Sequence, residues 1–343
     1  MKKVLVTGGN GFLGEHVVRY LNKLGGVTPI VFDKLKMPGT VTGDICSVRD
    51  VEKVFKGFGP FDCVYHLASA MPDKSHSDEE TWRISVLGTM TVAKAARSHH
   101  VPSFVFTSSN VTYGIPDSLP ITEDTPVRPI EIYGKSKVQA ETELYKFKDH
   151  MSIQIFRCPV ITGVGRLGIQ AILFEFISES RNVYVLGKGD NKYQFVDADD
   201  VAQALEKSSH IQGFDIYNIG GNGVKTLREL YQTIIEYASS TSSIISLPKA
   251  PALFILSLLD KMNVSPLGVY QYSMLGLSMY ADTGKIKKKL QWKPQKTITE
   301  SFIENYKWYV AHKGDFTHVG TGVSSSNKSL PKMKLFKLLK YFS

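Results

Sequence analysis

Three glycines near the N-terminus constrain the fold of this chain more than any other feature. Gly8, Gly11 and Gly14 follow directly after the β-rich run 3–7 and open an amphipathic helical stretch, 12–24. Glycine lets the backbone turn tightly and approach a diphosphate, whose charge is stabilised by free N–H groups and by the helix dipole. Strand, turn and helix in this order predict a dinucleotide-binding unit.

The loop formed by these glycines is expected to hold the cofactor diphosphate. The residues expected to contact the cofactor there are Gly8, Asn10, Gly11, Phe12, Leu13 and Gly14. Asp33 ends the second β-rich run, about 20 residues further on, where a carboxylate accepts bonds from both hydroxyls of the adenosine ribose. Because this carboxylate repels a 2′-phosphate, we expect NAD rather than NADP, with Lys34 and Lys36 nearby reducing the preference.

The first half of the chain alternates apolar runs with amphipathic helical stretches. Residues 62–67, 103–107 and 153–158 are mostly apolar, and helical patterns at 79–97 and 134–146 separate them. Strands without a polar face, joined by helices, are typical of a parallel sheet covered on both sides. The sequence therefore predicts an α/β fold with a Rossmann-type, doubly wound parallel sheet.

The pattern changes after residue 160 of the 343 residues, which predicts three parts. Residues 1–160 are expected to form the NAD-binding Rossmann domain, completed by later segments near 190–220. Residues 161–313 are expected to form mainly a smaller C-terminal substrate-binding lobe. Residues 314–343 begin with Gly, Thr, Ser and Asn and end in lysines and apolar residues, which predicts a flexible linker and a basic amphipathic tail.

The net charge of +9 does not by itself indicate nucleic-acid binding. The last thirty residues carry five lysines and one acidic residue, so the remaining excess is spread thinly and we expect no nucleic-acid partner. Cys46, Cys63 and Cys158 are far apart and show no metal-ligand spacing. We therefore expect reduced thiols, no metal site and a cytoplasmic location.

Tyr133 and Lys137 are four residues apart and so lie on one face of a predicted helix. A phenol with a pKa near 10 is a weak base at neutral pH, but a lysine ammonium one turn away favours the phenolate. Ser109 ends an earlier strand, where its hydroxyl could bond the reacting oxygen of a substrate. Alone, such a pair is more often a helix-start tyrosine and a surface lysine, so its interpretation depends on this context.

Taken together, these motifs resemble the extended short-chain dehydrogenases/reductases, in the NAD-dependent epimerase/dehydratase family with its sugar epimerases and 3β-hydroxysteroid dehydrogenases. The resemblance covers roughly residues 2–312. It rests on residues 7–14, Gly43-Asp44-Ile45, His66-Leu67-Ala68, Ser108-Ser109 with Tyr113-Gly114, and Tyr133 with Lys137.

The resemblance implies roles for individual residues. Asp44 and Ile45 would flank the adenine, and Leu67 and Ala68 would line the cofactor cleft. Ser109, Tyr133 and Lys137 would form the catalytic triad, with Tyr133 and Lys137 also contacting the cofactor.

Several positions depart from the family pattern. Dehydratases of this branch carry an acidic pair just after the triad hydroxyl, where this chain has Asn110 and Val111, so a 4,6-dehydration is not expected. Sugar-nucleotide members often have asparagine at Val160 and a diphosphate-binding arginine at Tyr193. Both differences weaken the expectation of a nucleotide diphosphate on the substrate.

The C-terminal residues 331–342 have helical periodicity, with apolar residues on one side and lysines opposite. A short basic helix of this kind can bind a membrane interface, peripherally at its inner face, or pack against the body of the protein or a partner subunit. A membrane surface and a homodimer both stay open as partners. If the membrane alternative holds, the apolar segment 251–259 could belong to the same surface.

The leading prediction is an NAD-dependent epimerase of a nucleotide-linked or lipid-linked sugar, acting by transient oxidation and re-reduction at a ring carbon. One alternative is a 3β-hydroxysteroid-type dehydrogenase, which would use the same triad and release NADH. Another alternative is a non-catalytic NAD-binding scaffold, against which the intact triad argues.

Overall fold

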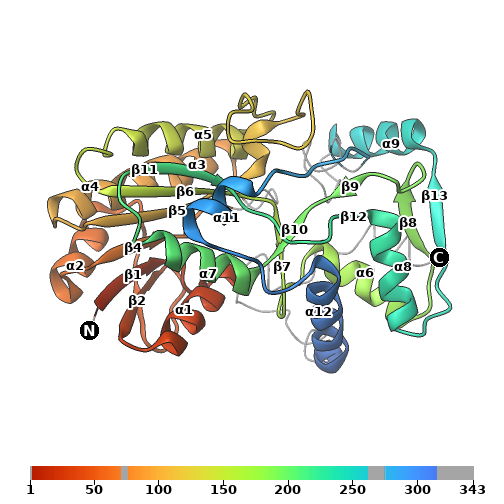
Figure 1. Cartoon of the computed structure of the whole chain (residues 1–343), viewed down its shortest axis with the longest axis horizontal. Coiled ribbons are helices and arrows are strands. Elements are labelled where there is room, and N and C mark those ends of the chain that lie inside the picture. Colours follow the sequence, from red (N-terminus) through yellow and green to blue (C-terminus); the bar gives the residue numbers. More distant parts are fainter. Residues whose placement is uncertain (1, 71–75, 262–273, 275, 315–343) are drawn as a thin grey trace. The chain divides into compact units, whose positions relative to one another are not determined.

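The computed structural model describes residues 2–70, 76–261, 274 and 276–314 (Figure 1). The predicted linker and basic amphipathic tail, 314–343, lie outside these residues, apart from Gly314 at the start of the linker. The chain divides into two compact units. Unit 1 comprises residues 1–161, 198–220 and 281–293, and unit 2 comprises residues 162–197, 221–280 and 294–343.

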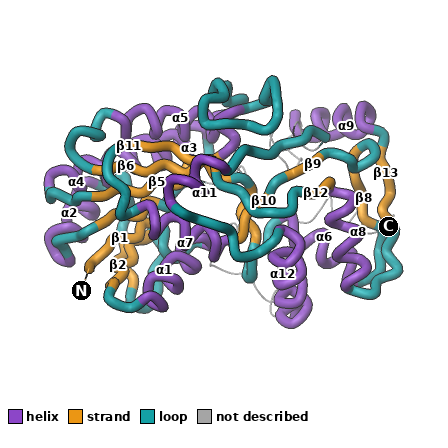
Figure 2. Tube along the Cα trace, in the orientation of Figure 1, coloured by secondary structure: helices purple, strands orange, loops and turns teal. Residues whose placement is uncertain are grey.

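Unit 1 is built on a seven-stranded sheet in the order β3-β2-β1-β4-β5-β6-β11. Every neighbouring pair of these strands is parallel, which confirms the predicted Rossmann-type fold (Figure 2). The strands are β1 (Lys2–Thr7), β2 (Val27–Asp33), β3 (Thr40–Thr42), β4 (Cys63–His66), β5 (Ser103–Ser109), β6 (Ser152–Cys158) and β11 (Phe214–Asn218).

Helices cover both faces of this sheet, because each parallel strand is followed by a crossover connection. Helices α1 (Phe12–Leu24) and α7 (Ala198–Ser208) pack together on one face (Figure 1). The other helices of unit 1 are α2 (Val48–Phe58), α3 (Asp78–Trp82), α4 (Thr89–Ser98), α5 (Ile132–Tyr145) and α11 (Gly284–Leu290). A π-helical turn at Arg83–Gly88 joins α3 to α4, so the helix predicted for 79–97 is present with one widened turn.

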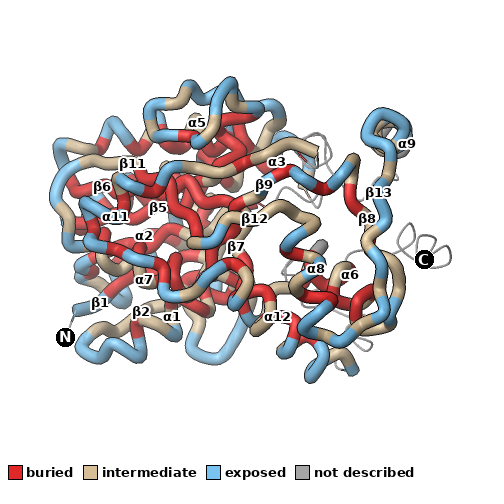
Figure 3. Tube along the Cα trace, turned by 45° about the vertical axis from the view of Figure 1, so that its right-hand side comes forward, coloured by how far each residue is buried: buried red, intermediate tan, exposed pale blue. Residues whose placement is uncertain are grey.

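The central strands β1, β4, β5 and β6 are largely buried, because most of their side chains are apolar and helices cover both faces of the sheet (Figure 3). Leu5, Phe104 and Ile153 have no exposed surface in the centre of the core. Burying a side chain of this size stabilises the fold by roughly 1.5–3 kcal/mol. Such a core holds the polar carboxyl ends of the strands in fixed positions.

Unit 2 contains short strands and several helices. They are α6 (Ile169–Ser178), β8 (Val183–Leu186), β9 (Lys192–Tyr193), β10 (Phe195–Asp197), β12 (Lys225–Thr226), α8 (Leu227–Tyr237), β13 (Ile244–Leu247), α9 (Lys249–Lys261) and α12 (Ile298–His312). Strand β7 (Val160–Thr162) leads into it along the chain. Phe174 packs edge-on against Phe302 and Tyr306, which joins α6 to α12.

Helix α9 is the apolar segment singled out in the sequence. The Phe254 side chain is 72% exposed, and Ile255 and Leu258 are 55% and 50% exposed. None of the helices in the described part of the chain has both the length and the apolar character that crossing a membrane requires.

Candidate functional site

The predicted site residues lie in unit 1, on its strands, its helices and the loops that join them, and most of them lie at one edge of its sheet. Thr7, Asp33, His66, Ser109 and Cys158 are the last residues of β1, β2, β4, β5 and β6. Because the strands are parallel, these carboxyl ends share one edge of the sheet. Ligands of doubly wound sheets bind at this edge, where strand order reverses between β1 and β4.

The glycine loop can be built only from glycine at two of its positions. A Cβ on Gly8, whose φ is +71°, would lie 2.7 Å from the backbone nitrogen of Ala68. A Cβ on Gly14 would lie 2.2 Å from the carbonyl oxygen of Gly8. Gly11 is the N-cap of α1 and has no side chain, so no N-cap side chain bonds the N–H groups of the first helical turn. This arrangement fits a dinucleotide diphosphate.

Asp33 is held in place by the loops on either side of it. Its Oδ2 accepts a hydrogen bond of 3.0 Å from the Asn10 backbone N–H, and its Oδ1 accepts one of 2.9 Å from Leu35. The Asn10 side-chain amide in turn donates to the Leu35 carbonyl and to Thr40 Oγ1, at 3.0 Å each. The backbone N–H groups of Asn10 and Leu35 thus orient the Asp33 carboxylate, and the Asn10 side chain ties the two loops together. The carboxylate retains acceptor positions suited to ribose hydroxyls.

Asp44 and Ile45 follow β3, at the same edge of the sheet as Asp33. One Asp44 oxygen accepts a 2.8 Å hydrogen bond from the Cys46 backbone N–H, and the other lies 3.4 Å from the Arg83 guanidinium. Ile45 is buried, and a Cβ on Gly88 would lie 2.6 Å from its Cδ1.

Leu67 and Ala68 continue from β4 beside the glycine loop. The Leu67 backbone N–H donates to the Thr7 carbonyl at 3.1 Å, and the Ala68 N–H lies 3.4 Å from Thr7 Oγ1. Both residues are partly exposed. Both residues thus lie next to Gly8 of the glycine loop, and the resemblance assigns them to the cofactor cleft.

Tyr133 and Lys137 occupy one face of α5, as their spacing predicts. The Lys137 ammonium lies 5.7 Å from the centre of the Tyr133 ring and donates a 2.8 Å hydrogen bond to the Thr107 carbonyl of β5. Lys137 is only 2% exposed. Burial lowers the pKa of Lys137 to about 8, against the opposing effects of Cys158 and Glu141.

Ser109 ends β5 two residues after Thr107. Its Oγ accepts a hydrogen bond of 3.4 Å from the Val111 N–H and so caps a short 3₁₀ turn, Asn110–Tyr113. The Thr112 hydroxyl also donates to the Ser109 carbonyl at 2.8 Å. The strand end that carries this hydroxyl is therefore tied to the turn that follows it.

Two buried features of the same region have no counterpart in the sequence-based predictions. The His66 ring bonds Thr7 Oγ1 at 2.8 Å and Thr89 Oγ1 at 3.0 Å. Burial, followed by the Lys137 charge, lowers the pKa of His66 to about 3, so the ring is neutral. The second feature is an ion pair between Glu141 and Arg157, whose members are both buried. The four-residue spacing from Lys137 to Glu141 was the available sequence signal.

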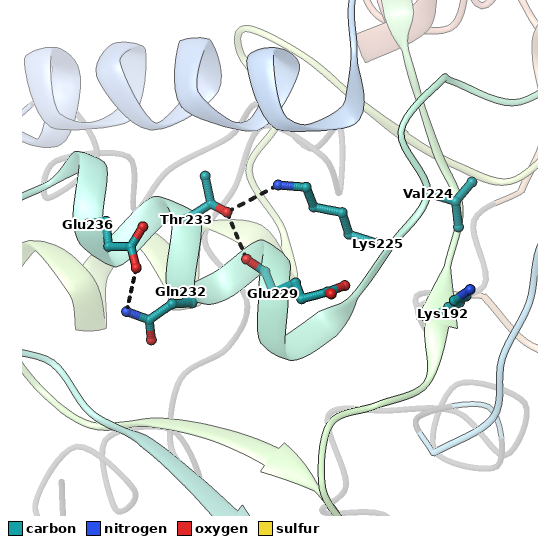
Figure 4. Close-up of a pocket in the computed structure, with 7 residues that line it drawn as sticks. All are labelled: Lys192, Val224, Lys225, Glu229, Gln232, Thr233 and Glu236. Carbon is teal, nitrogen blue, oxygen red and sulfur yellow. Dashed lines mark hydrogen bonds between the residues drawn. The ribbon is translucent and has the colours of Figure 1, made fainter.

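A separate pocket of about 450 Å³ lies within unit 2 (Figure 4). Side chains of α8 form much of its wall and pair with nearby groups: Lys225 Nζ donates to Thr233 Oγ1 at 3.3 Å, and Gln232 donates to Glu236 at 3.0 Å. None of the residues predicted for the cofactor or the triad lines it.

Comparisons with known proteins agree with this architecture. The model of the NAD-dependent epimerase/dehydratase family matches residues 4–220. An uncharacterised protein of Sinorhizobium fredii, y4nG, is 34% identical over 99% of this chain and 86% of its own length. The UDP-glucose 4-epimerase of Lactobacillus helveticus is 26% identical over 90% of this chain and 98% of its own length.

Solved structures share the fold at lower identity. The UDP-glucose 4-epimerase of Thermotoga maritima, crystallised with UDP-glucose, superposes with a TM-score of 0.76 and 22% identity, covering 91% of this chain and 99% of that one. The Bordetella bronchiseptica enzyme WbmG, in complex with NAD and UDP, gives a TM-score of 0.72 at 22% identity, covering 90% and 94%. The chain belongs to the NAD-dependent epimerase/dehydratase family and is an NAD-dependent enzyme of the extended short-chain dehydrogenase/reductase type.

Proposed function

We propose that the chain is an NAD-dependent epimerase that inverts one ring carbon of a nucleotide-linked sugar by transient oxidation and re-reduction. The observation that carries this proposal is the buried Lys137 ammonium, bonded to Thr107 and facing the Tyr133 ring on one side of α5. A UDP-glucose 4-epimerase that this chain matches along nearly its whole length supports the substrate class.

In the proposed mechanism, Tyr133 removes the proton from the sugar hydroxyl, and Ser109 donates a hydrogen bond to the same oxygen. Lys137 has three N–H donors, and the Thr107 carbonyl receives one. The other two are available for the Tyr133 phenolate and for the ribose beside the nicotinamide. The glycine loop and Asp33 would hold NAD, which would supply the hydride acceptor and donor that the oxidation and re-reduction require.

Epimerisation is favoured over dehydration by the residues that follow Ser109. Water elimination needs an acid and a base at this turn, and Asn110 and Val111 supply neither. The hydroxyl groups of the sugar are therefore retained, and re-reduction of the ring carbon leaves the sugar in its original oxidation state. A 3β-hydroxysteroid-type dehydrogenase would instead release one NADH per substrate.

Incubation of the enzyme with UDP-glucose or UDP-galactose, followed by chromatography of the sugars, tests the proposal. We expect interconversion of the two sugars while free NADH stays below the enzyme concentration. NADH that accumulates in step with an added hydroxysteroid would support the dehydrogenase instead. A protein that binds NAD but converts none of these compounds would support the scaffold alternative.

We also propose an alternative substrate for the same reaction, a lipid-linked sugar, processed by an enzyme that binds peripherally at the inner face of a membrane. Tyr193 replaces a diphosphate-binding arginine of the family, and burial raises the pKa of Tyr193 to about 12, so its phenol is a neutral group. Phe254 and Ile255 on α9 expose apolar surface, and the tail after Gly314 carries five lysines. These features favour a lipid carrier and a cytoplasmic enzyme at an anionic surface.

A further inference from the structure

A row of buried polar residues crosses three strands of unit 1 behind the proposed site. Ser108 on β5, Arg157 on β6 and Asn218 on β11 are direct neighbours in the parallel registers of these strands. All three are less than 7% exposed. Polar groups buried this deeply are costly unless they are bonded, so their partners show what the row does.

One carboxylate, that of Glu141, accepts hydrogen bonds from two residues of this row. Ser108 Oγ donates to Glu141 Oε1 at 2.5 Å, and the Arg157 guanidinium donates to Glu141 through Nη2 at 2.6 Å and through Nε at 3.2 Å. Arg157 also donates to the Tyr113 hydroxyl at 3.0 Å, which in turn donates to Asn218 Oδ1 at 2.7 Å. Glu141 is thus the acceptor through which helix α5 is joined to the row.

Glu141 lies one helical turn beyond Lys137, and Lys137 lies one turn beyond Tyr133. Residues four apart on a helix have neighbouring side chains, so the three form one stripe on α5. The stripe contacts consecutive residues of β5, because Lys137 bonds the Thr107 carbonyl and Glu141 bonds the Ser108 hydroxyl. Ser109 is the next residue.

The charged and titratable groups that act on Lys137 come from several elements. Burial raises the pKa of Cys158 on β6 to about 12, so this thiol is neutral at neutral pH. His66 on β4 is also neutral, because burial lowers its pKa to about 3. Of the groups that raise the pKa of Lys137, Glu141 is therefore the one that carries a negative charge at neutral pH.

We propose that Glu141 is a positioning residue: its carboxylate keeps the buried Lys137 ammonium protonated at neutral pH, and its bond to Ser108 fixes the strand end that carries Ser109. Arg157 holds this carboxylate in one orientation through its Nε and Nη2 hydrogen bonds. The inference deepens the proposed function, since it assigns the charge state on which the role of Lys137 rests.

The test measures the titration of Lys137 directly in the protein without NAD. The protein is labelled with ¹³C at the lysine ε-carbons, and the Lys137 signal is assigned by its loss in Lys137→Arg. In Glu141→Gln, which keeps an acceptor for Ser108 but removes the charge, we expect the Lys137 midpoint to fall by about one pH unit. The midpoint of the alkaline limb in the pH profile of kcat should move to lower pH by the same amount.

Glu141→Gln also leaves Arg157 buried without its ionic partner, which is strongly destabilising. The double variant Glu141→Gln/Arg157→Met removes both charges and should recover much of the lost stability. Its Lys137 midpoint should stay below that of the wild type, although by less than in the single variant because the Arg157 charge is removed as well. Glu141→Asp, which keeps the charge, should retain a midpoint near that of the wild type. Glu143→Gln, on the same helix but paired at the surface with Lys146, is the control and should change neither.

A merely structural role gives a different result. If Lys137 titrates at the wild-type midpoint in Glu141→Gln or in the double variant, Glu141 does not set its charge and the proposal is overturned. A lowered midpoint in a protein that converts no sugar would support the role of Glu141 and count against the proposed epimerase activity.

Discussion

The Lys137 ammonium donates its 2.8 Å hydrogen bond to the carbonyl oxygen of Thr107 rather than to a carboxylate. A carbonyl accepts the bond without forming an ion pair, so the positive charge of the ammonium remains available to the Tyr133 ring beside it. The backbone of β5 therefore fixes where the catalytic lysine lies, while its charge acts elsewhere.

Replacement of Tyr133 by phenylalanine should abolish the proton transfer but leave the cofactor site intact. We expect Tyr133→Phe to bind NAD normally and to lose turnover by about 10²- to 10⁴-fold, the usual contribution of a general base. Isothermal titration and a single-turnover assay measure the two effects separately. Tyr145→Phe, at an exposed position of the same helix, is the control. Near-normal turnover in Tyr133→Phe would remove the phenol from the mechanism.

The carboxylate of Asp33 should make the enzyme prefer NAD. We expect NAD to bind at least about tenfold more tightly than NADP, a difference of about 1.4 kcal/mol. Asp33→Ala should narrow this difference, because it removes the charge that repels the 2′-phosphate. Calorimetric titration of both cofactors checks the prediction, and equal affinities in the wild type would contradict it.

The glycine loop should not tolerate a methyl group at residue 14. In Gly14→Ala the new Cβ would lie 2.2 Å from the Gly8 carbonyl oxygen, so the loop must shift and NAD affinity should fall sharply. Gly57→Ala is a matched control, because its Cβ meets nothing within 4 Å and it lies inside α2. That variant should be more stable by roughly 0.5–1 kcal/mol, with unchanged NAD binding. Equal NAD affinity in the two variants would show that the close approach is not required.

The buried neutral His66 should make the fold sensitive to acid. Its folded pKa, about 3, lies below the usual 6.5, so the unfolded chain binds a proton that the folded chain does not. The resulting stability is complete above pH 6.5 and is lost as the pH falls toward 3, by up to about 1.4 kcal/mol per pH unit. Urea unfolding across this range should show a shallower pH dependence in His66→Gln. Identical slopes would mean that other groups cause the acid sensitivity.

The tail should decide whether the enzyme binds membranes. Sedimentation with anionic liposomes should recover the full chain but not a chain ending at Gly314, and added salt should weaken the binding by screening the lysines. Phe254→Ser tests the contribution of α9, with Val48→Ser, an exposed position on α2, as control. If the full chain stays in the supernatant and epimerises a free nucleotide sugar, the lipid-linked form of the proposal is wrong.

Local patterns were sufficient to predict the elements that carry the site. Helix α1 begins at Phe12 and β2 ends at Asp33, as expected, because glycine spacing and apolar runs act over a few residues. The Tyr133–Lys137 pair was predictable because four residues make one helical turn. Strand β3, with three residues, is too short to show a period, and α2 was not predicted.

The polar row behind the site was not predictable from the sequence alone. Ser108, Glu141 and Arg157 are brought together by strand register and helix packing over as many as 49 positions of the chain. The four-residue spacing from Lys137 to Glu141 is a local signal, but Ser108 and Arg157 at such separations carry none. Their significance depends on burial, which only the assembled core determines.

The order in which a ribosome makes this chain differs from the order in which unit 1 is assembled. Residues 281–293 complete that unit: Trp292 donates to the Asp200 carbonyl at 3.0 Å, and Lys285 donates to the Ile216 carbonyl at 2.7 Å. These residues emerge only after most of unit 2 has been translated. A nascent chain therefore cannot finish its nucleotide-binding unit early, and a chain truncated before residue 284 lacks helix α11, which packs against the edge strand β11.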